Sequence, residues 1–223
     1  VCIKKYDLIM DEEISLINTK TRNEKIKTFF VDNKKLLISF ILVLIIMIIG
    51  FYSYQIYKEG YKEKLSDKYN SAVIDHKNGN DDRSLTLMKE VIKGEDSTYS
   101  PLALYFVIDK NLTENSKEIN EFFDILINKT SLEHEIKNLI IYKKALYNAE
   151  FADENILLNI ISPVINSTSI WKSHALYLLA EYFYSKDERQ KSKEFFIQIL
   201  NTENANQDII KEAQKRLNRD LSE

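Results

Sequence analysis

Glycine, proline and cysteine are scarce in this sequence of 223 residues, which has 4, 2 and 1 of them. Glycine and proline form most tight turns, so their scarcity argues against β-sandwiches, barrels and glycine-rich phosphate-binding folds, and favours helices joined by polar loops. One cysteine can form no internal disulfide and is too few for a Cys-based zinc site. Basic residues are not in excess, with 31 Lys and Arg against 34 Asp and Glu, which excludes a strongly basic nucleic-acid binder.

No pattern in the sequence is typical of an enzyme. His76, His134 and His174 are far apart in the chain and form no metal-binding pair. Four scattered glycines cannot form a Walker A or dinucleotide-binding motif, and nothing places two carboxylates together in an apolar pocket. We therefore predict a protein that is not an enzyme and that holds no metal or cofactor.

One stretch of the chain is strongly apolar. Residues 36–54, from Leu36 to Tyr54, read LLISFILVLIIMIIGFYSY and comprise 19 residues without a charge. As a helix rising about 1.5 Å per residue they would extend roughly 28 Å, close to the ~30 Å of a bilayer core. A buried core helix would carry a polar stripe, which this stretch lacks. Its C-terminal end is rich in tyrosine, which favours the membrane interface, so we predict a transmembrane helix over 36–54.

A cleaved signal peptide is the alternative reading of this stretch. It would need a shorter apolar core and small residues before the cleavage site, and residues 50–53 offer no such pair, so we expect a retained anchor. Six basic residues lie near the N-terminal flank and four near the other flank, and the N-terminal tail is short. The positive-inside rule then predicts a cytoplasmic tail over 1–35 and a C-terminal region outside the cytoplasm.

The rest of the chain reads as consecutive helices. Apolar residues keep helical spacing after the anchor, which predicts a juxtamembrane helix over 55–80 that enters a first repeat. Helical hairpins are then expected over 81–223, with breaks at 78–81 and 186–188. Ser100 followed by Pro101 predicts a helix start with Ser100 as its cap. A last helix near Asp208–Leu221 has a highly charged outer face, as expected of a capping helix on an open stack.

Two of these hairpins resemble tetratricopeptide repeats, whose consensus places small residues at repeat positions 8 and 20 and large ones at 7, 11 and 24. Small residues let the two helices approach closely, and large ones fill the gap beside them. The residues that carry the resemblance are Ala72, Ser84 and Met88 in the first hairpin, and Leu179, Ala180, Phe183, Ser192 and Phe196 in the last. The middle hairpins depart from the pattern. The fold class implied is all-α, with a single N-terminal transmembrane helix followed by a degenerate tetratricopeptide-repeat α-solenoid.

The whole layout resembles the ancillary subunit family of the bacterial Sec translocon (YfgM-like). The resemblance rests on the acidic residues 11–13, the segment 26–33 before the apolar stretch, the tyrosine-rich residues 52–61 and the following Tyr69-Asn70-Ser71-Ala72. It implies a location in the bacterial inner membrane, with the tetratricopeptide domain in the periplasm and a role in a chaperone network. The implied partners are translocon subunits, a membrane-anchored foldase and unfolded secretory clients.

In tetratricopeptide arrays the first helix of each hairpin lines the concave, ligand-binding face. Carried onto the last repeat, repeat positions 2, 5, 9 and 12 are His174, Tyr177, Glu181 and Tyr184. Aromatic anchors beside adaptable polar residues suit peptide recognition, so these four residues form the expected peptide-binding face. Packing of the tyrosines against the rest of the stack is the alternative. A structural scaffold for an envelope or cell-division complex, without client binding, is the alternative function.

Overall fold

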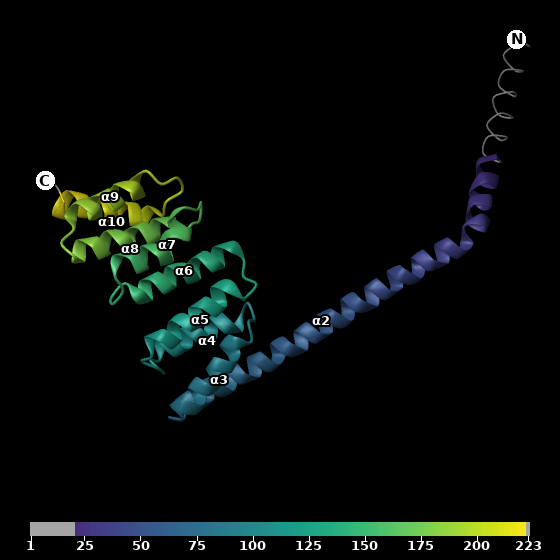
Figure 1. Cartoon of the computed structure of the whole chain (residues 1–223), viewed down its shortest axis with the longest axis horizontal. Helices are drawn as coiled ribbons and strands as arrows, with labels where there is room; N and C mark the ends of the chain where they lie inside the picture. The colour runs from purple at the N-terminus through teal and green to yellow at the C-terminus, as the bar shows by residue number, and fades with distance from the viewer. Residues whose placement is uncertain (1–20, 222–223) are drawn as a thin grey trace, which may run out of the picture. The chain divides into compact units, whose positions relative to one another are not determined.

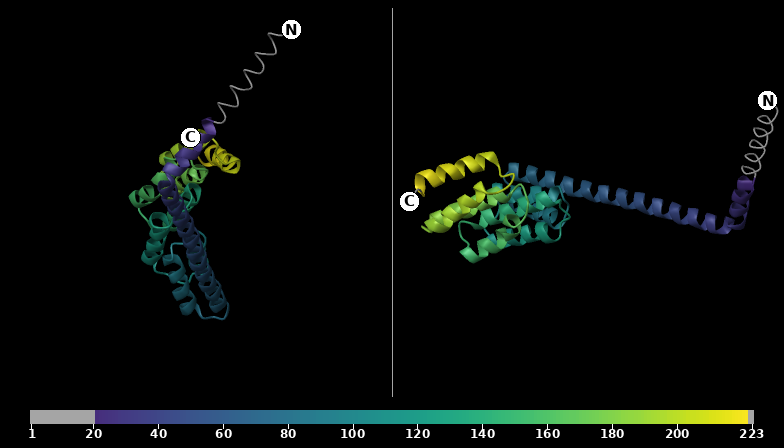
Figure 2. Two further views of the ribbon diagram at one scale, coloured as in Figure 1. Left: turned by 90° about the vertical axis from the view of Figure 1, so that its right-hand side faces the viewer. Right: turned by 90° about the horizontal axis from the view of Figure 1, so that it is seen from above.

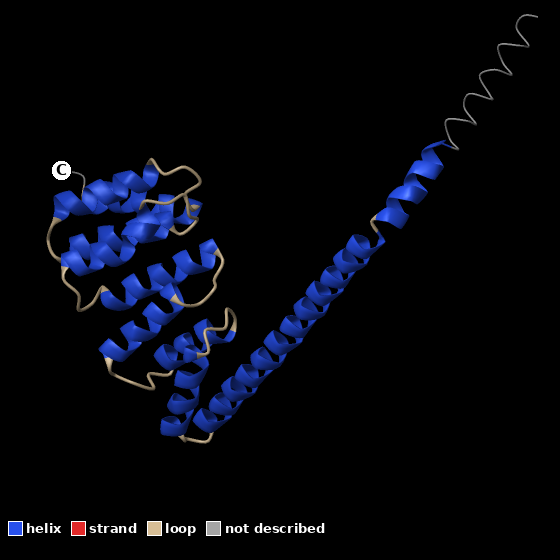
Figure 3. Cartoon of the chain, turned by 45° about the vertical axis from the view of Figure 1, so that its right-hand side comes forward, coloured by secondary structure: helices blue, strands red, loops and turns tan. Residues whose placement is uncertain are grey.

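A computed structural model describes residues 21–221, and all regular structure within that range is helical (Figure 3). The prediction of an all-α chain is confirmed for these residues. The acidic residues 11–13 and most of the expected cytoplasmic tail lie outside the described range. The chain divides into two compact units, Val1–Tyr61 and Lys62–Glu223, and the boundary falls within one long helix, α2 (Lys34–Lys77).

Within the described residues, nine helices follow a short helical stretch at residues 21–32. They are α2 (Lys34–Lys77), α3 (Asp81–Lys93), α4 (Tyr99–Asp109), α5 (Ser116–Asn128), α6 (His134–Asn148), α7 (Glu154–Ile165), α8 (Lys172–Ser185), α9 (Arg189–Leu200) and α10 (Gln207–Asp220). Among the described residues, α2 is more than twice as long as any other helix.

The helices of the second unit are stacked in chain order, with α3 and α10 at opposite ends (Figures 1 and 2). From α3 to α10, the backbones that lie close together belong to helices that are one or two elements apart in the chain. Close packing of this kind joins α3 to α5, α6 to α8 and α8 to α10, in addition to successive helices. Each helix therefore buries its apolar face against near neighbours in the sequence.

Three apolar clusters fill the stack. The first joins the end of α2 to α3, α4 and α5, with Met88, Leu104 and Phe123 fully buried in it. The second lies between α6, α7 and α8, and the third joins α8, α9 and α10. Because the clusters follow one another along the chain, the core is a series of local cores rather than one central core.

Side-chain caps position several helix starts. Asn115 accepts a hydrogen bond from the backbone N–H of Glu118 at the start of α5, and Asp153 accepts one from Ile156 at the start of α7. The turn between α8 and α9 comprises residues 186–188, and Asp187 has a φ of 61° there. Asp tolerates this left-handed conformation better than most residues, which explains the short connection.

The start of α4 differs from the prediction, because Ser100 is not its cap. The helix begins at Tyr99, and the carboxylate of Asp96 accepts the backbone N–H groups of Thr98 and Tyr99 at 2.9 and 2.8 Å. The buried hydroxyl of Ser100 instead donates to the carbonyl of Val91 at 2.8 Å. Ser100 thus ties the start of α4 to the end of α3, while Asp96 satisfies the free N–H groups. Pro101 lies in the first turn, where its missing N–H costs nothing.

Two fully buried serines test how the helix pairs are packed. The hydroxyls of Ser84 and Ser192 have no hydrogen-bond partner, and a buried unpaired hydroxyl destabilises a fold by about 1–3 kcal/mol. We expect Ser192→Ala to raise the free energy of unfolding by about 1 kcal/mol, since it removes that hydroxyl and alanine is the better helix former. Ser192→Leu should lower it by about 1–3 kcal/mol through overpacking.

Urea unfolding followed by circular dichroism in detergent micelles would measure both changes, with Ser84→Ala as a second instance. A lower midpoint for Ser192→Ala would mean that its hydroxyl stabilises the pair of helices in a way that the packing does not reveal.

Candidate functional site

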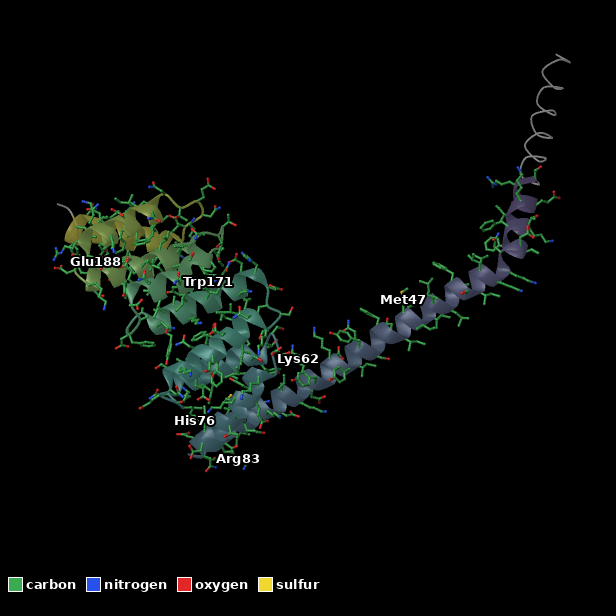
Figure 4. The ribbon with its side chains drawn as sticks, in the orientation of Figure 1. Met47, Lys62, His76, Arg83, Trp171 and Glu188 are labelled. Atoms are coloured by element: carbon green, nitrogen blue, oxygen red, sulfur yellow. The ribbon has the colours of Figure 1, made fainter. Side chains whose placement is uncertain are left out.

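The N-terminal half of α2 is the first candidate for a functional element. Its most apolar 18-residue window contains no buried residue, and it is the one helix among residues 21–221 that is long and apolar enough to cross a membrane. The side chains around Met47 point outward on every side of the helix (Figure 4). Within 36–54 all residues are exposed except Leu37, which is half-buried. The segment is therefore a candidate membrane span. The described residues contain one shorter apolar helix, α7, whose 12 residues are too few to cross a membrane.

The residues expected to bind peptides lie on one face of α8, and three of them contact α10. Tyr177, Glu181 and Tyr184 are half-buried beneath α10. The ring of Tyr177 packs edge-on against Phe196 of α9, with their centroids 5.6 Å apart. α10 therefore covers part of this face of α8.

Arg216 of α10 is the residue that fills it. Its guanidinium donates two hydrogen bonds to the carboxylate of Glu181, at 2.8 and 3.0 Å, and it also pairs with Asp220. The same group lies over the ring of Tyr184, 4.3 Å from its centroid. A bidentate, largely buried guanidinium that also stacks on an aromatic ring is among the stronger polar contacts in proteins. The sequence analysis did not identify Arg216, because it lies 35 residues from Glu181 among many other charges.

His174 lies apart from these three residues. Its ring centroid is 5.2 Å from that of Trp171 and 6.0 Å from that of Tyr142, and the rings of Tyr142 and Trp171 are stacked. Its Nδ1 atom is buried without a hydrogen-bond partner. Burial lowers the pKa of His174 below its ordinary value of 6.5, and the nearby carbonyl of Ile170 opposes that change. The histidine is thus held in its neutral form by an aromatic cluster.

The residues expected to pack the repeats all lie inside the stack. Each is at most 1% exposed, and they come from α2, α3, α8 and α9: Ala72, Ser84, Met88, Leu179, Ala180, Phe183, Ser192 and Phe196. These eight residues therefore belong to the packed interior of the stack.

An uncovered apolar groove lies between α4 and α6. It has a volume of about 490 Å³ and its floor includes Phe123 of α5. Its lining residues are Tyr105, Ile108, Asp109, Phe123, Lys143, Leu146 and Tyr147. The sequence analysis did not single out these residues, because their convergence depends on how far apart α4 and α6 are placed.

A second hollow, of about 500 Å³, is polar and lies where two loops meet. It is lined by the connection from α7 to α8 and by that from α9 to α10, with hydroxyl and amide side chains such as Ser167, Thr202 and Asn204. Within the described residues, no group of three His, Cys, Asp or Glu side chains could hold a metal ion.

Comparison with known proteins identifies no relative for this chain. No protein-family model, no curated protein and no solved structure matches it.

The Arg216 contact predicts a local role for α10. We expect Arg216→Ala to loosen α10, because it leaves Glu181 half-buried without its partner and removes the cation from Tyr184. Limited proteolysis should then cut between residues 201 and 206 several times faster than in the parent chain. Lys211→Ala, which removes an exposed cation of the same helix, is the matched control. Equal cleavage of both variants would contradict the role given to Arg216.

His174 predicts a dependence of stability on pH. Since its folded-state pKa lies below 6.5, the unfolded chain binds more protons below about pH 6.5. The contribution of His174 to the stability of the fold is therefore complete above about pH 6.5, and it is lost as the pH falls through its lowered folded-state pKa. We expect the urea midpoint to fall between about pH 7 and pH 5.5, and less so in His174→Gln.

Proposed function

We propose that this chain is a non-enzymatic, membrane-anchored protein-interaction module, an ancillary subunit of the Sec translocon that takes part in a periplasmic chaperone network. The observation that carries the proposal is the apolar stretch 36–54, which no other described residue covers. It precedes, in the sequence, a stack of helices with an uncovered apolar groove. The resemblance of the sequence to the ancillary subunit family supplies the name of the complex. No feature of the described residues calls for a cofactor.

The stretch from Leu36 to Tyr54 would lie in the bacterial inner membrane. The proposal places the N-terminus in the cytoplasm, since basic residues are more numerous before the stretch than after it. The unit Lys62–Glu223 would then lie in the periplasm.

A degenerate tetratricopeptide arrangement is part of the proposal. It is supported by the complete burial of Ala72, Ala180 and Phe196 and by the packing of each helix against its first and second neighbours. Arrays of this kind are built from repeats that each contact only their neighbours, and they present extended surfaces to other proteins.

Anchoring explains how weak contacts could suffice. A module tethered to the bilayer next to the translocon meets an emerging polypeptide at a high effective concentration, so that modest affinity gives substantial occupancy. The expected partners are translocon subunits, a membrane-anchored foldase and unfolded secretory clients.

Affinity purification from a mild detergent tests the proposal. We expect the full chain to recover translocon subunits or a membrane-anchored foldase. A double variant, Ile45→Arg with Ile46→Arg, should lose them, because each arginine at the centre of a membrane helix costs about 2.5–3.5 kcal/mol of insertion. The same variant should pass into the alkaline extract of the membrane fraction, whereas the parent chain stays in the pellet.

The matched control is the double variant Ile74→Arg with Ile156→Arg, which places the same two charges on exposed residues of the second unit. Recovery of none of these partners by the parent chain, or the release of the parent chain by alkali, would overturn the proposal.

A further inference from the structure

The spacing of the even-numbered helices is uneven. The backbones of α6 and α8 lie close together, as do those of α8 and α10, whereas α4 and α6 make no such approach. The groove occupies the space between α4 and α6, and Phe123 of the intervening α5 forms part of its floor. Among the even-numbered helices from α4 to α10, the row is therefore open between α4 and α6.

The walls of the groove are mostly apolar. Leu146 is 44% exposed, and the ring of Tyr147 packs edge-on against Phe151, which is 55% exposed. The apolar surface thus continues from the groove onto the turn after α6. Burial raises the pKa of Tyr105 to about 12, so its hydroxyl stays neutral and contributes no charge to the site.

The charges at the rim are not balanced. The carboxylate of Asp109 is held by Lys110, with 2.6 Å between them, and Lys144 is paired with Asp124 at 2.7 Å. Lys143 lines the groove, is exposed and makes no ion pair with any described residue. The groove therefore presents apolar walls beside one ammonium group whose charge no neighbour neutralises.

The chain itself shows what kind of element covers such a surface. At the end of the stack, α10 lays Ile210, Ala213 and Leu217 on α8 and α9, and its Arg216 pairs with Glu181 of the surface beneath. Within this chain, an apolar surface is thus covered by an amphipathic helix that carries one charge opposite to a charge of that surface. At the groove the receptor charge is positive, so the matching charge on the incoming helix must be negative.

From these observations we propose that the groove between α4 and α6 binds an amphipathic helix of a partner protein, with its apolar face on Tyr105, Leu146 and Tyr147 and a carboxylate at Lys143. Helices bind in apolar grooves through side chains spaced three and four residues apart. The inference rests on the proposed function, in that it takes the second unit to bind proteins, and it adds the place and the chemistry of one partner.

The probe is a fluorescent alanine-based peptide of about 16 residues, a length at which a helix can form, with leucines three and four residues apart and one glutamate beside them. A matched peptide carries lysine in place of that glutamate. Fluorescence anisotropy would measure Kd with the full chain in phosphatidylcholine nanodiscs, and empty nanodiscs correct for binding to lipid.

We expect the acidic peptide to bind about tenfold more tightly than the basic one, and Lys143→Glu to reverse that preference. Leu146→Ser should weaken both peptides about tenfold, because it removes apolar contact area at the groove. The matched controls are Lys129→Glu and Ile156→Ser, which change exposed residues outside the groove and should leave both values of Kd unchanged.

Equal binding of the two peptides, or no response to Lys143→Glu, would overturn the inference. So would displacement of the peptide by oleate in a Lys143-dependent manner together with tighter binding of oleate, since the groove would then be a site for a fatty acid. Binding of the acidic peptide without recovery of translocon subunits would leave the groove in place and refute the proposed complex. Recovery of translocon subunits by Lys143→Glu, together with no peptide binding by the parent chain, would refute the groove as a binding site and leave the proposed complex in place.

Discussion

The exclusion of water from the apolar stretch 36–54 is the constraint on which the rest depends. Nineteen residues without a charge stand exposed on almost every face of α2, and the described residues offer them no cover. Apolar surface left in water costs about 25 cal/mol per Å². A helix that satisfies its own backbone hydrogen bonds can leave water for a bilayer, which an uncovered strand could not do. The proposed anchor follows from this cost, and so does the tethering of everything after residue 61.

The second unit solves the same problem by local means. Each helix buries its apolar side against helices one or two places away, and the last helix presents a highly charged outer face to solvent. At the end of the stack α10 covers apolar residues of α8 and α9, with Arg216 joined to Glu181 and Tyr184. A groove remains between α4 and α6, where no helix of the described residues fills the space.

Local features were predictable from the sequence, and features that depend on distance were not. The break at 186–188 and the last helix could be predicted from local signals, and the apolar stretch was evident from composition alone. Ser100 was assigned the role of Asp96, since both are good capping residues and only packing against α3 distinguishes them. The contact of Arg216 with Glu181 spans 35 residues, and the groove depends on the distance between two helices, so neither leaves a pattern in the sequence.

Packing that is confined to near neighbours also has a consequence for how the chain matures. Contacts of short sequence separation form quickly, because little loop entropy is lost in making them. Each hairpin can acquire its structure as soon as the next one or two helices have been synthesised, without waiting for the C-terminus. The second unit could therefore fold progressively from its N-terminal end, and α10, synthesised after α8 and α9, would then cover their apolar residues.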